Sequence, residues 1–159
     1  MTGKIIPPDE HALHQRLIDA TCPIGQARLS SVLMINDRRY PWVLLVPRVA
    51  GVEELHDLDA AQRAMLIEEI ACVTRGMQAE FSPVRINVAD IGNRVAALHV
   101  HIVARQVGDA AWPHVVWSRE RQAHTEERSL RAMLDRLRHA SRELSGFVPS
   151  RSVAHETGR

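Results

Sequence analysis

Two apolar runs separated by a short polar stretch constrain the fold of this chain more than any other feature. The runs cover residues 27–35 and 42–49, and only the residues NDRRYP lie between them. Parallel strands need a crossover of a dozen or more residues, whereas antiparallel strands can be joined by a short turn. The spacing therefore predicts a pair of antiparallel strands.

Helical patterns occur before and after the two apolar runs. Asp59 and Gln62 have the spacing of a capping box, so we predict a long helix that begins here and ends before Pro83. The apolar face of this helix would hold Met65, Leu66, Ile70, Val73 and Met77. We predict a shorter helix over residues 8–20, after two prolines, and an amphipathic helix that starts at Thr125.

The remaining segments complete a mixed domain. Residues 85–88 and 96–104 are predicted strands separated by turn residues, and residues 21–26 are predicted to be a connecting loop. This pattern predicts an α+β fold in which an antiparallel β-sheet packs against a long central helix, an N-terminal helix and a C-terminal helix. We expect residues 1–150 to form a single domain and residues 151–159 to form a flexible tail.

Composition excludes several classes of function. The chain has 20 Lys and Arg and 19 Asp and Glu, a formal charge of +1, so we predict no binding to nucleic acid. No apolar run is long enough for a signal peptide or a membrane span, so we predict no membrane association. The two cysteines, Cys22 and Cys72, cannot form a disulfide framework, and a reducing, cytoplasmic setting fits best.

The chemistry is predicted to lie in the last strand, which carries two histidines. Residues two apart on a strand share a face, so His99 and His101 should project side by side while Leu98, Val100 and Ile102 enter the core. Imidazoles titrate near neutral pH and can act as nucleophiles or acid–base groups. An isolated pair of this kind is also compatible with half-exposed strand residues or with a metal site.

Amide side chains precede this strand. Asn87 and the Gly92–Asn93 turn lead into it, and amide groups beside a glycine turn suit a phosphate site that lacks net positive charge.

The order Asn87, then 92–95, then 97–105 resembles the signature of the histidine triad (HIT) superfamily. Residues 34–48 are similar to the nucleoside-side hairpin of that family, and residues 52–58 to the start of its central helix.

The resemblance implies a nucleotide hydrolase or nucleotidyl transferase. It makes His99 the nucleophile that attacks the α-phosphorus of a dinucleoside polyphosphate or nucleoside phosphoramidate, forming a nucleotidyl-histidine that water hydrolyses. His101 would assist, and Asn87 and Asn93 would hold phosphate oxygens. The resemblance also implies a homodimer, a nucleotide as the substrate, and no metal or other cofactor.

Three departures from the family pattern bear on this activity. Ala97 stands at the first histidine position of the triad, Asn93 replaces a glutamine, and Trp42 replaces the histidine of the hairpin. Without the first histidine, protonation of a poor leaving group should be slow. The alternative is a nucleotide-binding or regulatory protein with little or no catalysis.

Further residues are weaker candidates. Asn36 is a candidate to bind the ribose hydroxyls, although turn chemistry explains it equally well. Trp112 and Trp117 are candidates to close over the active site or its neighbour across a dimer, with hydrophobic anchoring of their loop as the alternative. His11 and His14 have helical spacing for a metal pair, but a polar helix surface explains them better.

Overall fold

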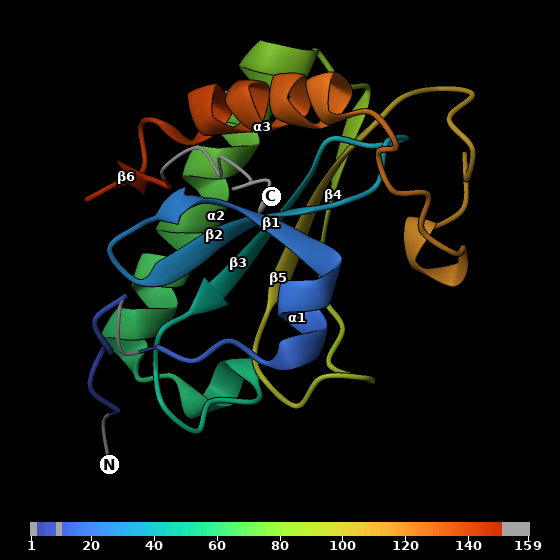
Figure 1. Ribbon diagram of the computed structural model, residues 1–159. Helices are drawn as coiled ribbons and strands as arrows, with labels where there is room; N and C mark the ends of the chain where they lie inside the picture. Colours follow the sequence, from blue (N-terminus) through green and yellow to red (C-terminus); the bar gives the residue numbers. More distant parts are fainter. Residues whose placement is uncertain (1–2, 9–10, 151–159) are drawn as a thin grey trace, which may run out of the picture.

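The computed structural model describes residues 3–8 and 11–150, and in this part of the chain six antiparallel strands form one sheet with three α-helices (Figure 1). The order across the sheet is β4-β5-β3-β2-β1-β6. The strands are β1 (Thr21–Gln26), β2 (Ser30–Ile35), β3 (Trp42–Pro47), β4 (Arg85–Asp90), β5 (Val100–Arg105) and β6 (Val148–Pro149). The α-helices are α1 (Gln15–Ala20), α2 (Ala60–Phe81) and α3 (Glu127–Ser141), with 3-10 turns η1 (Leu55–Asp57) and η2 (Val116–Ser118). The predicted α+β class is confirmed.

The central strands have the antiparallel pairing that the short turn predicted. Leu33 of β2 lies opposite Leu44 of β3, and Leu44 in turn lies opposite His101 of β5. Every residue of β2, β3 and β5 is buried. These three strands therefore form the buried centre of the sheet, and β5 carries His101.

Helix α2 begins as its capping box predicts. The Asp59 carboxylate accepts a hydrogen bond from the Gln62 backbone N–H at 2.8 Å, and the Gln62 side chain accepts one from the Asp59 N–H at 3.0 Å. The helix packs against α3 at Gly76, where an added Cβ would lie 1.7 Å from the Ala140 carbonyl oxygen. Only glycine permits this close approach of the two helices.

The predicted loop over residues 21–26 was wrong, because these residues form β1. Pro23 and Gly25 suggested a break in the strand, but a register shift between them places both within the ladder. Gly25 also allows a close approach of the C-terminal segment, since an added Cβ would lie 2.5 Å from the ring of Phe147.

Several predicted boundaries also differ from the structure. Helix α1 begins at Gln15, not at Pro8, and the His14 side chain caps it by accepting the Arg16 N–H at 3.2 Å. Helix α3 begins at Glu127, two residues after Thr125. Strand β5 begins at Val100, not at residue 96, because the Leu98 N–H donates to the Val52 carbonyl at 3.1 Å instead of to a neighbouring strand.

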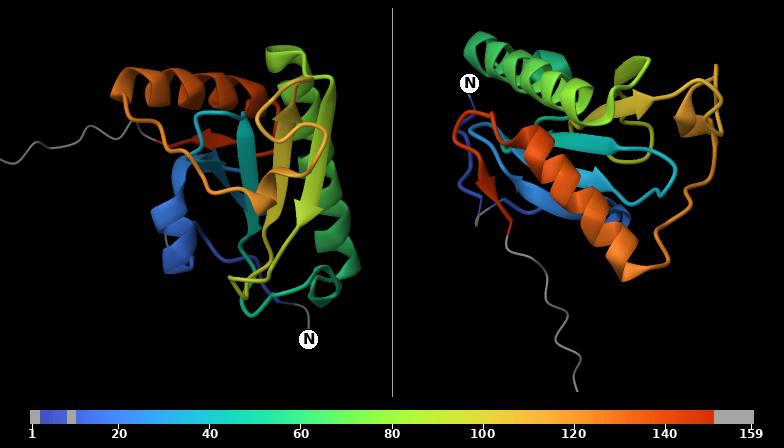
Figure 2. Two further views of the ribbon diagram at one scale, coloured as in Figure 1. Left: turned by 90° about the vertical axis from the view of Figure 1, so that its right-hand side faces the viewer. Right: turned by 90° about the horizontal axis from the view of Figure 1, so that it is seen from above.

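Apolar side chains fill both faces of the sheet. Figure 2 shows α1 and α2 on opposite sides of it. One core lies between the sheet and helices α2 and α3, and a second lies between the other face, α1 and the segment over residues 106–118. The histidine segment passes between these two cores.

Within the described residues, no helix combines the length and the apolarity that a membrane span requires. The predicted flexible tail, residues 151–159, lies outside the described residues.

Candidate functional site

His99 and His101 lie side by side on the face of the sheet opposite α2. Their ring centroids are 5.1 Å apart, and the side chains of Leu98, Val100 and Ile102 enter the other core, as the alternation predicted. Both histidines are buried, with 4% and 8% of their surface exposed. The pair is therefore enclosed and not half-exposed.

A backbone carbonyl fixes the tautomer of His99. Its Nδ1 lies 2.6 Å from the Ala97 carbonyl oxygen, which can only accept a hydrogen bond. Nδ1 must then carry the proton, so in the neutral ring Nε2 has a free lone pair. A neutral imidazole with a bare nitrogen is the form that attacks an electrophile.

His101 has the opposite arrangement. The indole Nε1–H of Trp42 donates to His101 Nδ1 at 3.0 Å, so the proton of the neutral ring lies on Nε2. Burial, with a smaller contribution from the neighbouring His99, lowers the pKa of His101 to about 3. His101 is therefore neutral at physiological pH and offers a hydrogen-bond donor.

A second tryptophan completes the enclosure. The Trp117 ring centroid lies 5.7 Å from that of His101 and 5.9 Å from that of Trp42, both edge to face. We call Trp42, His99, His101 and Trp117 the aromatic cluster. The sequence indicated Trp42 only because it stands where the family has a histidine. Its contact with His101 could not be predicted in this way, because that contact depends on strand register.

Asn87 lies on the same face as the histidines, one strand further out. It is opposite Val103, two residues after His101, and its Oδ1 accepts a hydrogen bond from Arg105 Nη1 at 2.8 Å. Because Arg105 occupies the oxygen, the orientation of the amide is fixed and its NH₂ group remains available as a donor.

Arg105 is itself fixed by the segment that follows β5. Its guanidinium donates to Asp109 at 2.7 and 2.9 Å and to the His114 carbonyl at 3.0 Å. Burial alone would raise the pKa of Asp109, but hydrogen bonds from Arg105 and from two backbone N–H groups outweigh it and hold that pKa low. The pair is therefore ionised within the domain.

Asn93 lies in the exposed turn before His99. This turn is tied to α1, because Arg16 Nη1 donates to the Arg94 carbonyl at 3.2 Å. The Asn93 side chain is exposed, and its contact with a substrate stays a prediction.

Asn36 and Trp112 are not part of the aromatic cluster. Asn36 follows β2 at the end of the sheet that lies away from His99, and its Oδ1 accepts the His124 backbone N–H at 3.0 Å. Trp112 lies against the Arg105 guanidinium, with 5.8 Å between the guanidinium carbon and the ring centroid.

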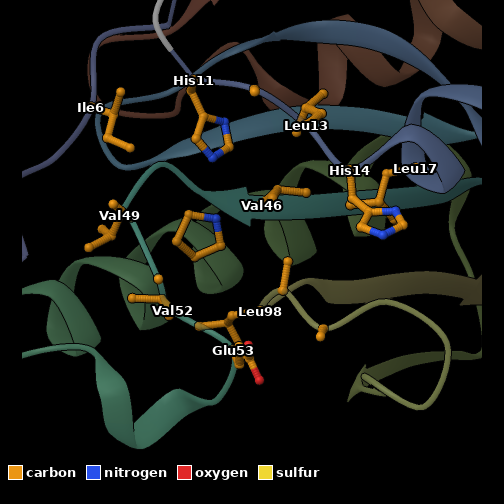
Figure 3. Close-up of a pocket in the computed structure, with 16 residues that line it drawn as sticks. Ile6, His11, Leu13, His14, Leu17, Val46, Val49, Val52, Glu53 and Leu98 are labelled. Carbon is orange, nitrogen blue, oxygen red and sulfur yellow. The ribbon is translucent and has the colours of Figure 1, made fainter.

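A cavity of about 360 Å³ adjoins the residues directly before His99. Ala97 and Leu98 line it, and Figure 3 shows the imidazoles of His11 and His14 on one side and Glu53 on the other. The remaining lining is mainly aliphatic. Burial lowers the pKa of His11, and the charge of Arg48 adds to this effect.

Among the described residues, no group of three or more His, Cys, Asp or Glu side chains is arranged to hold a metal ion.

Comparison with known proteins places the chain in a family. The HIT domain family model matches residues 19–108, more than half of the sequence. The chain belongs to the HIT family. This family includes nucleotide hydrolases and nucleotidyl transferases, and some of its members are not catalytic. No curated protein matches this HIT chain.

Solved structures of other HIT proteins agree with this assignment. A histidine triad protein from Bradyrhizobium japonicum is 44% identical, with a TM-score of 0.76, covering 80% of this chain and 95% of that one. One from Marinobacter aquaeolei VT8 is 36% identical, with a TM-score of 0.81 and coverages of 85% and 98%. One from Sinorhizobium meliloti 1021 is 35% identical, with a TM-score of 0.77 and coverages of 81% and 96%. The resemblance predicted from the sequence is confirmed.

Proposed function

We propose that this HIT protein is a nucleotide hydrolase or nucleotidyl transferase that acts at the α-phosphorus of a dinucleoside polyphosphate or nucleoside phosphoramidate. The observation that carries the proposal is the hydrogen bond between His99 Nδ1 and the Ala97 carbonyl, at 2.6 Å. It leaves Nε2 as the bare, nucleophilic nitrogen of a neutral ring.

The reaction proceeds in two displacements. His99 Nε2 forms a bond to the α-phosphorus, and the bond from phosphorus to the leaving oxygen or nitrogen breaks, with the leaving group taking that electron pair and then a proton from solvent. Water next attacks the phosphorus and loses a proton to solvent, the bond from phosphorus to Nε2 breaks with its electron pair returning to His99, and a nucleoside monophosphate leaves. Neither displacement needs a metal ion or another cofactor.

We assign the contacts to the nonbridging phosphate oxygens to three donors. These are the Nε2–H of His101, the NH₂ group of Asn87, and Asn93 in the exposed turn. Preorganised donors stabilise the charge that shifts during phosphoryl transfer. The substrate contacts expected of Asn36 and Trp112 stay predictions.

The cavity beside Ala97 and Leu98 supports a place for an organic part of the substrate. Its volume of about 360 Å³ is within the range of roughly 300–1,000 Å³ common for small-molecule sites. Its mainly aliphatic walls, with a few polar groups at the sides, suit a nucleoside better than a free phosphate.

We also propose a cytoplasmic homodimer. The unpaired Cys22 and Cys72 are compatible with a reducing compartment. Strand β4 forms one edge of the sheet and carries the exposed Val88, which leaves apolar surface and backbone groups for a second copy of this chain.

A nucleotide-binding protein without catalysis is the second candidate. It is favoured by Ala97, which cannot supply the imidazole expected at the first triad position, and by the burial of the histidine pair, with Trp117 packed against His101. Such a protein would keep the phosphate contacts but form no covalent adduct.

A test of His99 as the nucleophile distinguishes the enzyme from the binding protein. We expect wild-type protein to cleave adenosine phosphoramidate or a dinucleoside polyphosphate, and His99→Ala and His99→Asn to remove nearly all turnover while nucleotide affinity is retained. Mass spectrometry of acid-free quenched reactions should show a nucleotidyl adduct on His99.

His56→Ala is the matched control, because the His56 side chain is 84% exposed and outside the aromatic cluster. Wild-type protein that binds a nucleotide but neither cleaves any of these substrates nor forms an adduct would favour the binding protein.

A further inference from the structure

We propose that Trp42 is a positioning residue that fixes the tautomer of His101, so that His101 presents an N–H and not a lone pair to the substrate phosphate. The inference rests on the proposed function for its catalytic consequence. The tautomer itself is a property of the free protein and is tested separately.

The geometry assigns this role to one hydrogen bond between two strands. Trp42 lies opposite Val103, so it is the diagonal neighbour of His101 on the same face of the sheet. Its Nε1 is 3.0 Å from His101 Nδ1. An indole N–H is a donor and never an acceptor, so this contact requires a bare Nδ1 and puts the ring proton on Nε2.

Burial of the pair also disfavours the doubly protonated form of His101. Trp42 and His101 are 4% and 8% exposed, and the rings of His99 and Trp117 pack on the same imidazole. Protonation of His101 would place a second N–H against the indole N–H inside this enclosure. The neighbouring His99 also lowers the pKa of His101, so it opposes protonation of that ring in the same direction as burial.

The tautomer of His101 decides whether its contact with a phosphate oxygen is attractive or repulsive. An Nε2–H donates to a nonbridging phosphate oxygen and stabilises its charge, whereas a bare Nε2 would point a lone pair at that oxygen. The site would then contain two imidazoles with different roles, one with a bare Nε2 and one with a protonated Nε2. The Ala97 carbonyl sets His99 as the nucleophile, and the Trp42 indole sets His101 as the donor.

Trp117 provides a matched comparison within the same cluster. Its ring centroid is 5.7 Å from that of His101, against 5.6 Å for Trp42. The buried Nε1 of Trp117 has no hydrogen-bond partner among the described residues, so this ring packs on His101 without setting its tautomer.

The test is nitrogen-15 NMR of the histidine rings in the full-length protein without ligand. Wild-type protein should show His101 as the Nε2–H tautomer alone. Trp42→Phe should give a mixture of both tautomers and raise the pKa of His101, because the neutral Nδ1 loses its donor. Trp117→Phe should leave the tautomer unchanged. Replacing Trp42 by benzothienylalanine keeps the ring shape and removes only the N–H, so it decides the matter if Trp42→Phe folds poorly.

Activity supplies the second readout. With adenosine phosphoramidate, we expect kcat/KM of the Trp42 variants to fall about 10-fold, less than the roughly 10²- to 10³-fold loss typical when a transition-state donor is removed outright. A His101 that remains purely Nε2–H in the benzothienylalanine protein would overturn the inference and leave the proposed function intact. If the tautomer changes in the Trp42 variants but the wild-type protein hydrolyses no substrate, the proposed function alone is overturned.

Discussion

The same side-chain type acquires two different chemical characters within one strand segment because each ring has a different fixed partner. A carbonyl acceptor beside His99 forces the proton onto Nδ1, and an indole donor beside His101 excludes it from Nδ1. Burial, with a smaller effect of the neighbouring His99, keeps the His101 ring neutral by lowering its pKa to about 3. The proposed distinction between a nucleophilic and a donating histidine therefore rests on two hydrogen bonds, not on the amino-acid type.

The adjacency of the two histidines could be predicted from the sequence, because side chains alternate on a strand with a period of two. The partners of the rings could not. Trp42 is 59 positions away from His101, and their contact depends on the register between β3 and β5. The Ala97 contact arises because the strand begins only at Val100, which leaves residues 97–99 free to turn.

Ala97 is the residue whose replacement tests the missing triad member. It is half-buried and lines the cavity of about 360 Å³, so an imidazole at this position has room. If it aids protonation of the leaving group, Ala97→His should raise kcat about 10-fold or more for phosphoramidates of basic amines, since general acids contribute typically about 10²- to 10⁴-fold.

The measurement is kcat for a series of amine leaving groups of increasing basicity. Substrates with good leaving groups act as the control and should change little. An equal change in kcat across the whole series would contradict a role in leaving-group protonation.

At the scale of elements, Arg105 joins three parts of the chain at the end of β5. Its guanidinium reaches Asn87 on β4, Asp109 in the following segment, and the His114 carbonyl. The rings of Tyr40 and Trp112 lie within 5.9 Å and 5.8 Å of it. Arg105 therefore links the orientation of a candidate substrate contact to the segment that carries Trp117.

This linkage predicts a large loss of stability in Asp109→Ala. Arg105 and Asp109 side chains are 2% and 8% exposed, so the substitution leaves a buried guanidinium without its counter-ion. We expect the free energy of unfolding to fall by about 3 kcal/mol or more. Urea denaturation followed by tryptophan fluorescence measures the change.

Glu127→Ala is the matched control, because Glu127 pairs with Arg131 at the same i, i+4 spacing but both side chains are more than half exposed. Its cost should be below about 0.5 kcal/mol. Similar losses in the two variants would show that the Arg105 contacts contribute no more than a surface pair.

Elements were predictable where a local signal agreed with the tertiary structure. Asp59 and Gln62 alone indicate the start of α2, because both partners of the capping box lie within one turn. β1 was missed because Pro23 and Gly25 are unfavourable in isolated strands, and only pairing with β2 and the approach of Phe147 compensate for them.

At the scale of the whole molecule, the two edges of the sheet differ in the surface they present. The β4 edge carries the exposed Val88, and Ile67 of α2 is exposed on the flank of the helix opposite the Gly76 contact with α3. The other edge is β6, a strand of two residues. A long edge beside exposed apolar side chains favours pairing with another strand, whereas a very short edge does not.

We therefore predict that Val88→Lys dissociates the proposed homodimer and that Val148→Lys on β6 does not. Val88 and Val148 are 46% and 63% exposed in the single chain, so both variants should fold normally. A lysine on a paired edge would have to be desolvated, which opposes association. Size-exclusion chromatography with light scattering at micromolar concentration should give a dimer mass for the wild type and Val148→Lys and a monomer mass for Val88→Lys. A monomeric wild type would contradict the dimer, and a dimer in all three proteins would place the interface away from β4.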